Sequence, residues 1–160
     1  MKTGRAFSPG SGHARVSSVC SGAESGLRVR SRGVSANILV VDDSPTVRNI
    51  IKIYLMNLRL SIIEAEDAAR ALQLLRLVPV SVVIADINMP GMDGITFVKE
   101  LRAEAKPHLR GIPVILLTAE KGGDLRQRGA EAGANAFIQK PVSHHDLTET
   151  VRQYLPQAAP

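Results

Sequence analysis

Four apolar runs in this chain each end in a residue that can take part in chemistry, and this repeated pattern most limits the fold. The runs end at Asp42-Asp43, at Asp86, at Thr118 and at Lys140. The run from Val82 to Asp86 is rich in β-branched residues and leads into a turn with Pro and Gly, which predicts a buried strand. The carboxyl ends of parallel strands line one crevice, so we expect the four ends to converge there.

Strand-like and helix-like segments alternate along the chain from residue 37. Apolar runs predict strands at 37–41, 61–65, 82–86, 113–118 and 136–139. Apolar residues at helical spacing predict helices after each strand, at 45–58, 68–75, 94–104, 123–132 and 143–155. In the first of these helices, Val47, Ile50, Ile51 and Leu55 are expected to face inward. The alternation predicts an α/β fold, a three-layer sandwich around a parallel five-stranded sheet with right-handed crossovers.

The charge distribution separates an N-terminal extension from the expected domain. Residues 1–36 hold six basic residues and one acidic residue, whereas residues 37–160 hold fourteen of each. The extension is rich in Ser, Gly and Arg, has no helical or strand period, and is predicted to be disordered. A basic arm for nucleic acid, or a targeting peptide, is the alternative for this segment. Residues 37–157 are expected to form one domain that binds no nucleic acid, with no output domain after it.

The cysteine content and the hydropathy of the sequence indicate the cellular compartment of the protein. The single cysteine, Cys20, lies in the extension, which excludes an intrachain disulfide and makes a thiolate metal site implausible. No apolar stretch reaches the roughly 18 residues that a bilayer span requires. The sequence therefore predicts a cytoplasmic protein that does not insert into a membrane.

The carboxylates at the strand ends favour a divalent cation. If Asp42, Asp43 and Asp86 lie together, their charges repel one another, and a bound cation removes that conflict. A small set of oxygen ligands favours Mg²⁺ over a Ca²⁺ cage or a Zn²⁺ site. An Asp pair alone could equally be a solvated turn or a helix cap, so the prediction depends on the joint placement with Thr118 and Lys140.

This set of residues suits phosphoryl transfer, in which positioning and charge neutralisation dominate. The carboxylate of Asp86 would attack phosphorus. Lys140 and Mg²⁺ would contact the equatorial oxygens of the transferred phosphoryl group, and the Thr118 hydroxyl would donate a hydrogen bond to one of these oxygens. A phosphatase of the haloacid dehalogenase type also combines Asp, Thr, Lys and Mg²⁺, although the first strand here ends in Asp-Asp-Ser rather than in the Asp-x-Asp motif of those enzymes.

Residues 37–156 resemble the receiver domain of two-component response regulators. The matching motifs are Asp42-Asp43, Asp86 within Asp-Ile-Asn-Met-Pro-Gly-Met-Asp-Gly, Thr118-Ala119 and Lys140-Pro141. The resemblance implies a flavodoxin-like (βα)5 sheet of order 2-1-3-4-5, the general strand order of this fold. It further implies that Asp86 accepts phosphate from a sensor histidine kinase. By the same resemblance, Asp43, Asp86 and the Asn88 carbonyl bind Mg²⁺, Asp42 acts through water, and Lys140-Pro141 is a cis peptide.

Three further residues resemble those at matching positions of stand-alone, chemotaxis-type regulators. Asn88 and Glu120 stand where this family modulates dephosphorylation, and Phe137 matches its switch aromatic. The resemblance implies a phosphoacceptor that assists its own phosphorylation and dephosphorylation rather than an enzyme, acting in chemotaxis or motility as a monomer or weak dimer. A downstream target protein would bind the face formed by residues 123–132, 136–139 and 143–155. A phosphorelay intermediate that passes phosphate to a histidine phosphotransferase is the alternative.

Overall fold

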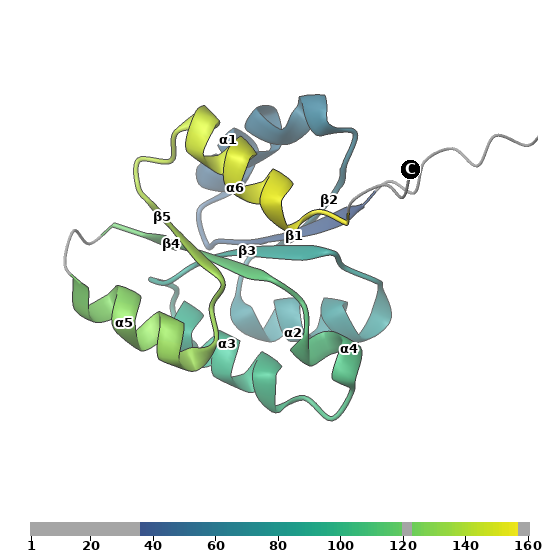
Figure 1. Ribbon diagram of the computed structural model, residues 1–160, viewed down its shortest axis with the longest axis vertical. Coiled ribbons are helices and arrows are strands. Elements are labelled where there is room, and N and C mark those ends of the chain that lie inside the picture. Colours follow the sequence, from purple (N-terminus) through teal and green to yellow (C-terminus); the bar gives the residue numbers. More distant parts are fainter. Residues whose placement is uncertain (1–35, 120–122, 157–160) are drawn as a thin grey trace, which may run out of the picture. The chain divides into compact units, whose positions relative to one another are not determined.

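The computed structural model describes residues 36–119 and 123–156, which form a parallel five-stranded sheet between two layers of helices (Figure 1). The sheet has the order β2-β1-β3-β4-β5, and every pair of neighbouring strands is parallel. This confirms the flavodoxin-like α/β fold and its strand order. The strands are β1 (Asn37–Val41), β2 (Ser61–Ala65), β3 (Val82–Asp86), β4 (Val114–Thr118) and β5 (Ala136–Gln139).

The helices cover both faces of the sheet. Helices α1 (Pro45–Leu55) and α6 (His144–Tyr154) lie on one face, and α2 (Ala68–Leu77), α3 (Gly94–Ala103) and α5 (Gly123–Ala132) lie on the other (Figure 1). Alternate residues of each strand point to opposite faces, which divides the core into two clusters. Ile84, for example, belongs to the α1–α6 cluster, whereas Leu116 belongs to the α3–α5 cluster.

Polar side chains fix where four of the helices begin. Ser44, Asp67, Asp93 and Ser143 each accept a hydrogen bond from the backbone N–H three residues further on. Such N-caps satisfy one of the free donors at a helix start and set the entry direction of the chain. These four side chains therefore set the first turns of α1, α2, α3 and α6.

Two details of the sequence-based prediction were wrong or incomplete. Ile50, expected to face inward, has 38% of its surface exposed, because the buried stripe of α1 runs through Ile51 and Leu55. A short helix, α4 (Pro107–Arg110), was not predicted, since four residues are too few to show a helical period. A single 3₁₀ turn, η1 (Met56–Leu58), follows α1.

Arg102 joins three parts of the domain near the amino ends of the strands. Its guanidinium donates hydrogen bonds to the carbonyl oxygens of Gly133, Arg110 and Ile112 and to Oδ1 of Asn135. The α3 helix is thereby tied to α4 and to the loop before β5. Burial lowers the pKa of this guanidinium from its ordinary value, and the carbonyl oxygens stabilise its charge.

Several sequence-based predictions lie outside the described residues. They concern the basic extension up to residue 35, Glu120, and the C-terminal boundary at 157. Within the described ranges, none of the helices combines the length and hydrophobicity that crossing a bilayer requires.

Candidate functional site

Three carboxylates meet at the carboxyl ends of β1 and β3. In the sheet register Val41 lies opposite Ala85, so Asp42 and Asp86 leave neighbouring strands side by side. Asp42, Asp43 and Asp86 can each place one carboxylate oxygen within 4.8 Å of those of the other two. Asp42 and Asp86 are buried, whereas Asp43 is exposed. The predicted convergence of the acids is therefore confirmed.

Asp42 is held by hydrogen bonds on both carboxylate oxygens. Its Oδ1 accepts from the backbone N–H of Ser44 at 2.9 Å, and its Oδ2 lies 3.0 Å from Nζ of Lys140. The backbone carbonyl of Asp42 also accepts from the guanidinium of Arg48 at 2.6 Å. With both oxygens engaged, Asp42 is the member of the cluster least free to contact a metal ion directly.

Lys140 is the cation that the buried carboxylates share. It follows β5, and its Nζ lies 2.9 Å from Oδ2 of Asp86 as well as close to Asp42. Burial alone would lower the pKa of the ammonium, but the carboxylates of Asp86 and Asp42 raise it above its ordinary value. Lys140 therefore stays charged at neutral pH. The Lys140-Pro141 peptide bond is cis, as the family resemblance implied.

The two oxygens of Asp86 have different surroundings. Oδ2 is paired with Lys140, whereas Oδ1 is buried and has no hydrogen-bond partner among the described residues. Burial raises the pKa of the Asp86 carboxyl above its ordinary value, and Lys140 and the Asn88 backbone offset only part of that rise. A buried, unpaired carboxylate oxygen is costly unless a cation or another ligand satisfies it.

A divalent cation fits this cluster. Within the part of the chain that the structure describes, the Asp86 Oδ1 atom lacks a hydrogen-bond partner, and exposed Asp43 has a carboxylate oxygen within 4.8 Å of one from Asp86. The donors are all oxygens, which is the ligand type that Mg²⁺ prefers.

Thr118 is buried at the end of β4, next to the cluster. Asp86 pairs with Leu117 in the sheet register, so Thr118 lies one residue beyond the partner of Asp86. Its main-chain carbonyl accepts a hydrogen bond from the Lys140 N–H at 2.7 Å. Thr118 continues the row of Val114 and Leu116, which faces α3 and α5, whereas Asp86 continues the row that faces α1 and α6.

The loop from Asn88 to Gly94 is fixed against the end of β3. A Cβ atom on Gly94 would lie 2.3 Å from the backbone oxygen of Asp86, so only glycine allows this close approach. Gly91 turns the loop with a φ of +78°. Asn88 is exposed at the start of the loop, and its backbone N–H lowers the pKa of the Asp86 carboxyl, which offsets part of the rise that burial causes.

Phe137 of β5 packs against α5 at a glycine. A Cβ atom on Gly129 would lie 2.6 Å from Cε1 and 2.9 Å from Cζ of the Phe137 ring. The ring is partly buried in the α3–α5 cluster. It also lines a hollow of about 440 Å³, together with residues of α5 and α6 such as Arg126 and His145.

Sequence reasoning missed three residues that build the site: Ser44, Arg48 and Gly94. The cap position of Ser44 before Pro45 is a recognisable signal, and a glycine at the start of a helix could have suggested a close approach. Arg48 carries no local signal, because its partner Glu64 comes from the next strand.

Comparisons with known proteins agree with this geometry. A family model described as the response regulator receiver domain matches residues 38–152. Chemotaxis protein CheY-3 of Vibrio cholerae is 39% identical over 113 residues, which cover 70% of this chain and 85% of that protein. Chemotaxis protein CheY of Pseudomonas aeruginosa is 37% identical over 117 residues, covering 72% and 93%. The solved structure of chemotaxis response regulator CheY4 of V. cholerae matches with a TM-score of 0.70 at 30% identity, covering 76% of this chain and 99% of that one.

Proposed function

Because this chain belongs to the family of response regulator receiver domains, we propose that its phosphoacceptor is Asp86. The family membership makes the chain a phosphoaccepting signalling protein rather than a metabolic enzyme. One observation carries the choice of residue: of the three acids in the cluster, Asp86 alone combines burial, an unpaired carboxylate oxygen and a cationic neighbour at 2.9 Å. Asp42 has both oxygens engaged, and Asp43 is exposed.

The Asp86 carboxylate attacks phosphorus. Its Oδ2 lies beside the Lys140 ammonium, and its unpaired Oδ1 is the oxygen open to a cation. In transfer from a phosphohistidine, a carboxylate oxygen of Asp86 forms a bond to phosphorus while the phosphorus–nitrogen bond breaks, and the released imidazole keeps the electron pair and takes up a proton. The Lys140 ammonium then lies beside the new acyl phosphate, and the Thr118 hydroxyl donates to one of its oxygens.

Mg²⁺ is the cation that we propose for the cluster. Asp43, Asp86 and the backbone carbonyl of Asn88 would bind this ion directly, and Asp42 would contact it through a water molecule. When bound, Mg²⁺ neutralises negative charge that would otherwise repel the incoming phosphoryl group. Oxygen ligands and the unsatisfied Asp86 Oδ1 support this choice.

Decay of the acyl phosphate depends on residues near the site. We assign Asn88 and Glu120 a role in modulating attack by water, and Glu120 lies outside the described residues. A short-lived acyl phosphate fits a regulator that signals by protein binding. A long-lived one would favour the alternative, a phosphorelay intermediate. The family match leaves the haloacid dehalogenase alternative without support.

Two kinds of protein partner are expected: a kinase that donates the phosphoryl group, and a target that binds after phosphorylation. A sensor histidine kinase must cover the edge that contains Asp86, where α1 starts, and Ile50 and Ile53 are exposed further along this helix. A downstream target would bind the face of α5, β5 and α6, which holds the hollow lined by Phe137 and His145. Phe137 would report phosphorylation to that face by moving its ring. We propose that the protein acts as a monomer or weak dimer.

The similar chemotaxis proteins suggest the pathway. Both relatives described above are named as chemotaxis proteins and match along most of their length. We therefore propose a role in chemotaxis or motility for a receiver unit spanning residues 37–157. The cytoplasm, predicted from the sequence, is the compartment in which a kinase-fed receiver would act.

Intact-mass spectrometry tests the phosphoacceptor. Incubation with Mg²⁺ and acetyl phosphate or phosphoramidate should add one phosphoryl group to the native protein and none to Asp86→Asn. Asp93→Asn, which replaces the exposed N-cap of α3 by another residue that can cap a helix, is the matched control and should still be phosphorylated. An unchanged mass of the native protein, or phosphorylation of Asp86→Asn to the native level, would contradict the assignment.

A further inference from the structure

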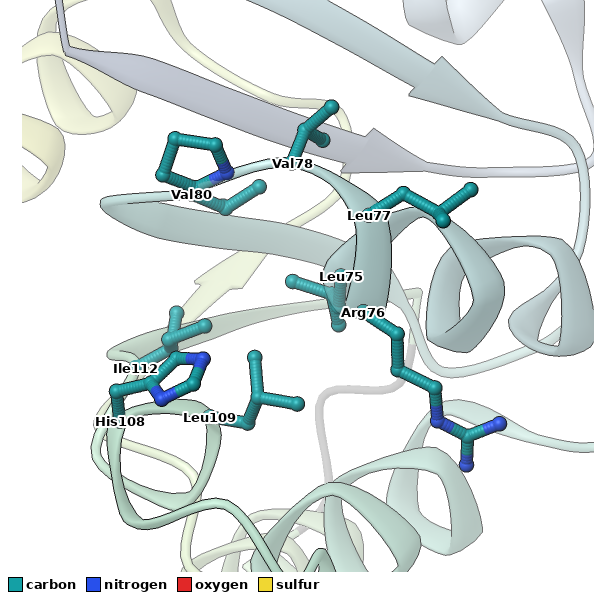
Figure 2. A pocket seen from close by; sticks show the side chains of 9 residues that line it. Leu75, Arg76, Leu77, Val78, Val80, His108, Leu109 and Ile112 are labelled. Atoms are coloured by element: carbon teal, nitrogen blue, oxygen red, sulfur yellow. The ribbon is translucent and has the colours of Figure 1, made fainter.

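A groove opens at the edge of the sheet opposite the carboxylate cluster, between the end of α2 and the short helix α4 (Figure 2). Its volume is about 370 Å³. In Figure 2, His108, Leu109 and Ile112 line one wall, and Leu75 and Val80 lie across from them. Leu75, Leu109 and Ile112 are buried, so the base of the groove is part of the hydrophobic core.

The groove is remote from the phosphorylation site. Val80 precedes β3 and Ile112 precedes β4, whereas Asp86 and Thr118 end the same two strands. A five-residue strand spans about 13 Å at roughly 3.3 Å per residue. A molecule in the groove therefore leaves the carboxylate cluster open.

An exposed leucine extends the apolar surface beyond the groove. Among the described residues, four large apolar side chains are strongly exposed, and three of them, Ile50, Ile53 and Met56, lie on α1 and the turn that follows it. The fourth, Leu77, is 76% exposed at the end of α2 and lines the groove. A small ligand within the groove would leave Leu77 in water, whereas a protein segment that crosses the rim would cover it.

Basic side chains line and flank the groove. Arg76 and His108 line it, and Lys106 and Arg110 are exposed beside His108 on the α4 segment. Glu104 is the one acidic residue in the stretch from 104 to 110, and it is already ion-paired with Arg76. The excess of positive charge favours an occupant with carboxylates beside its apolar group.

We propose that this groove is a docking site for an acidic segment of a partner protein, which inserts an apolar side chain between α2 and α4. The carboxylates of that segment face Lys106, His108 and Arg110, and its apolar part covers Leu77. Because the groove is at the far edge of the sheet, docking does not require phosphorylation of Asp86. This surface differs from the α5–β5–α6 face and adds a phosphorylation-independent contact to the function proposed above.

Backbone amide shifts in ¹⁵N NMR spectra of the full chain test the proposal. The probe is a short synthetic peptide with Leu at helical i, i+3 and i+4 spacing and Glu at the intervening positions. Saturable shifts are expected at Leu77, His108 and Ile112, with an affinity that falls as salt is added. Peptides with Lys in place of Glu, or with Ala in place of Leu, should not bind.

Two charge-introducing variants locate the site without disturbing the core. Leu77→Glu and His108→Glu change exposed residues and should each weaken the peptide by about tenfold or more. Ile53→Glu is the matched control, since Ile53 is 62% exposed on α1, and its affinity should equal that of the native chain. Asp86→Asn, which cannot be phosphorylated if the functional proposal holds, should also bind unchanged.

Several outcomes would overturn the proposal. These are the absence of shifts at the groove, equal binding of the Lys peptide, and an effect of Ile53→Glu as large as that of Leu77→Glu. Displacement of the Glu peptide by decanoate, with retained affinity for decanoate in Leu77→Glu, would assign the groove to small organic anions instead. None of these results depends on whether Asp86 is the phosphoacceptor.

Discussion

Replacing Gly129 by Ala should destabilise the domain, although the same change usually stabilises a helix. In a helix interior, Gly→Ala contributes about 0.5–1 kcal/mol of stability, because alanine loses less backbone entropy on folding. At Gly129, however, the new Cβ would lie 2.6 Å from Cε1 of Phe137 and 3.1 Å from Cδ1 of Leu116. Real Cβ atoms do not approach other carbon atoms this closely, so the ring or the helix must move.

The cost of that movement sets the expected magnitude. Inserting a methyl group into a packed site typically costs about 1–3 kcal/mol. Since the ring can turn toward the hollow that it lines between α5 and α6, the cost should lie in the lower half of this range. After subtraction of the helix contribution, Gly129→Ala should lower the free energy of unfolding by about 1 kcal/mol.

Urea denaturation of four variants separates the contact from the helix effect. Gly123→Ala changes the first residue of α5, where an added Cβ has no neighbour within 4 Å, so it should be neutral or slightly stabilising. In a Phe137→Ala background, Gly129→Ala should become stabilising, which gives a coupling energy of about 1–2 kcal/mol. A gain in stability on Gly129→Ala with Phe137 intact, or the same effect in both backgrounds, would refute the packing argument.

Three further predictions concern charged groups. Lys140→Met should lower the free energy of unfolding, measured in urea without Mg²⁺, by about 3 kcal/mol, because two buried carboxylates lose their shared cation. Mg²⁺ should restore part of this lost stability. An equal loss with and without Mg²⁺ would count against a metal at this cluster. The raised pKa of Asp86 means that the folded state binds a proton more tightly than the unfolded state, so the stability contributed by this group falls as pH rises from its ordinary value of 3.8. In urea titrations at a series of pH values without Mg²⁺, Asp86→Asn should therefore have a higher free energy of unfolding than the native protein near neutral pH, and this difference should shrink toward acidic pH. A difference in unfolding free energy that stays constant with pH would contradict the raised pKa of Asp86. Arg102→Lys should cost about 1–3 kcal/mol, since one ammonium cannot replace a guanidinium that serves several carbonyl oxygens, whereas Arg70→Lys on the exposed side of α2 should change the urea midpoint little.

The strands and most helices could be predicted from the sequence because their signals are local. A buried parallel strand such as Val82–Asp86 is a continuous apolar run, and caps such as Ser143 stand next to the helix that they start. Convergence of the reactive residues could be predicted as well, since parallel strands bring their carboxyl ends to one edge. The predicted positions of Asp42, Asp86 and Lys140 followed from topology alone.

Features that depend on two distant segments could not be predicted. The exposure of Ile50 depends on which stripe of α1 meets the sheet, and the helical period allowed either. The contact between Gly129 and Phe137 joins a helix to a strand, and no property of either residue reveals it. The pairing of Lys140 with Oδ2, which leaves Oδ1 of Asp86 unsatisfied, is a matter of side-chain geometry rather than of sequence pattern.

The alternation of side chains along β4 explains how a change at the carboxylate cluster could reach α5. Asp86 ends a row that packs toward α1 and α6, so a change confined to Asp86 would act mainly on that layer. Thr118 ends the row of Leu116 on the opposite face, and Phe137 lies across from Leu116 in the same layer. A hydroxyl drawn toward a phosphoryl group on Asp86 would therefore alter packing in the layer where Phe137 contacts Gly129. Because the Phe137 ring packs directly against the backbone of α5 at Gly129, we expect the ring to respond first and to transmit the change to α5.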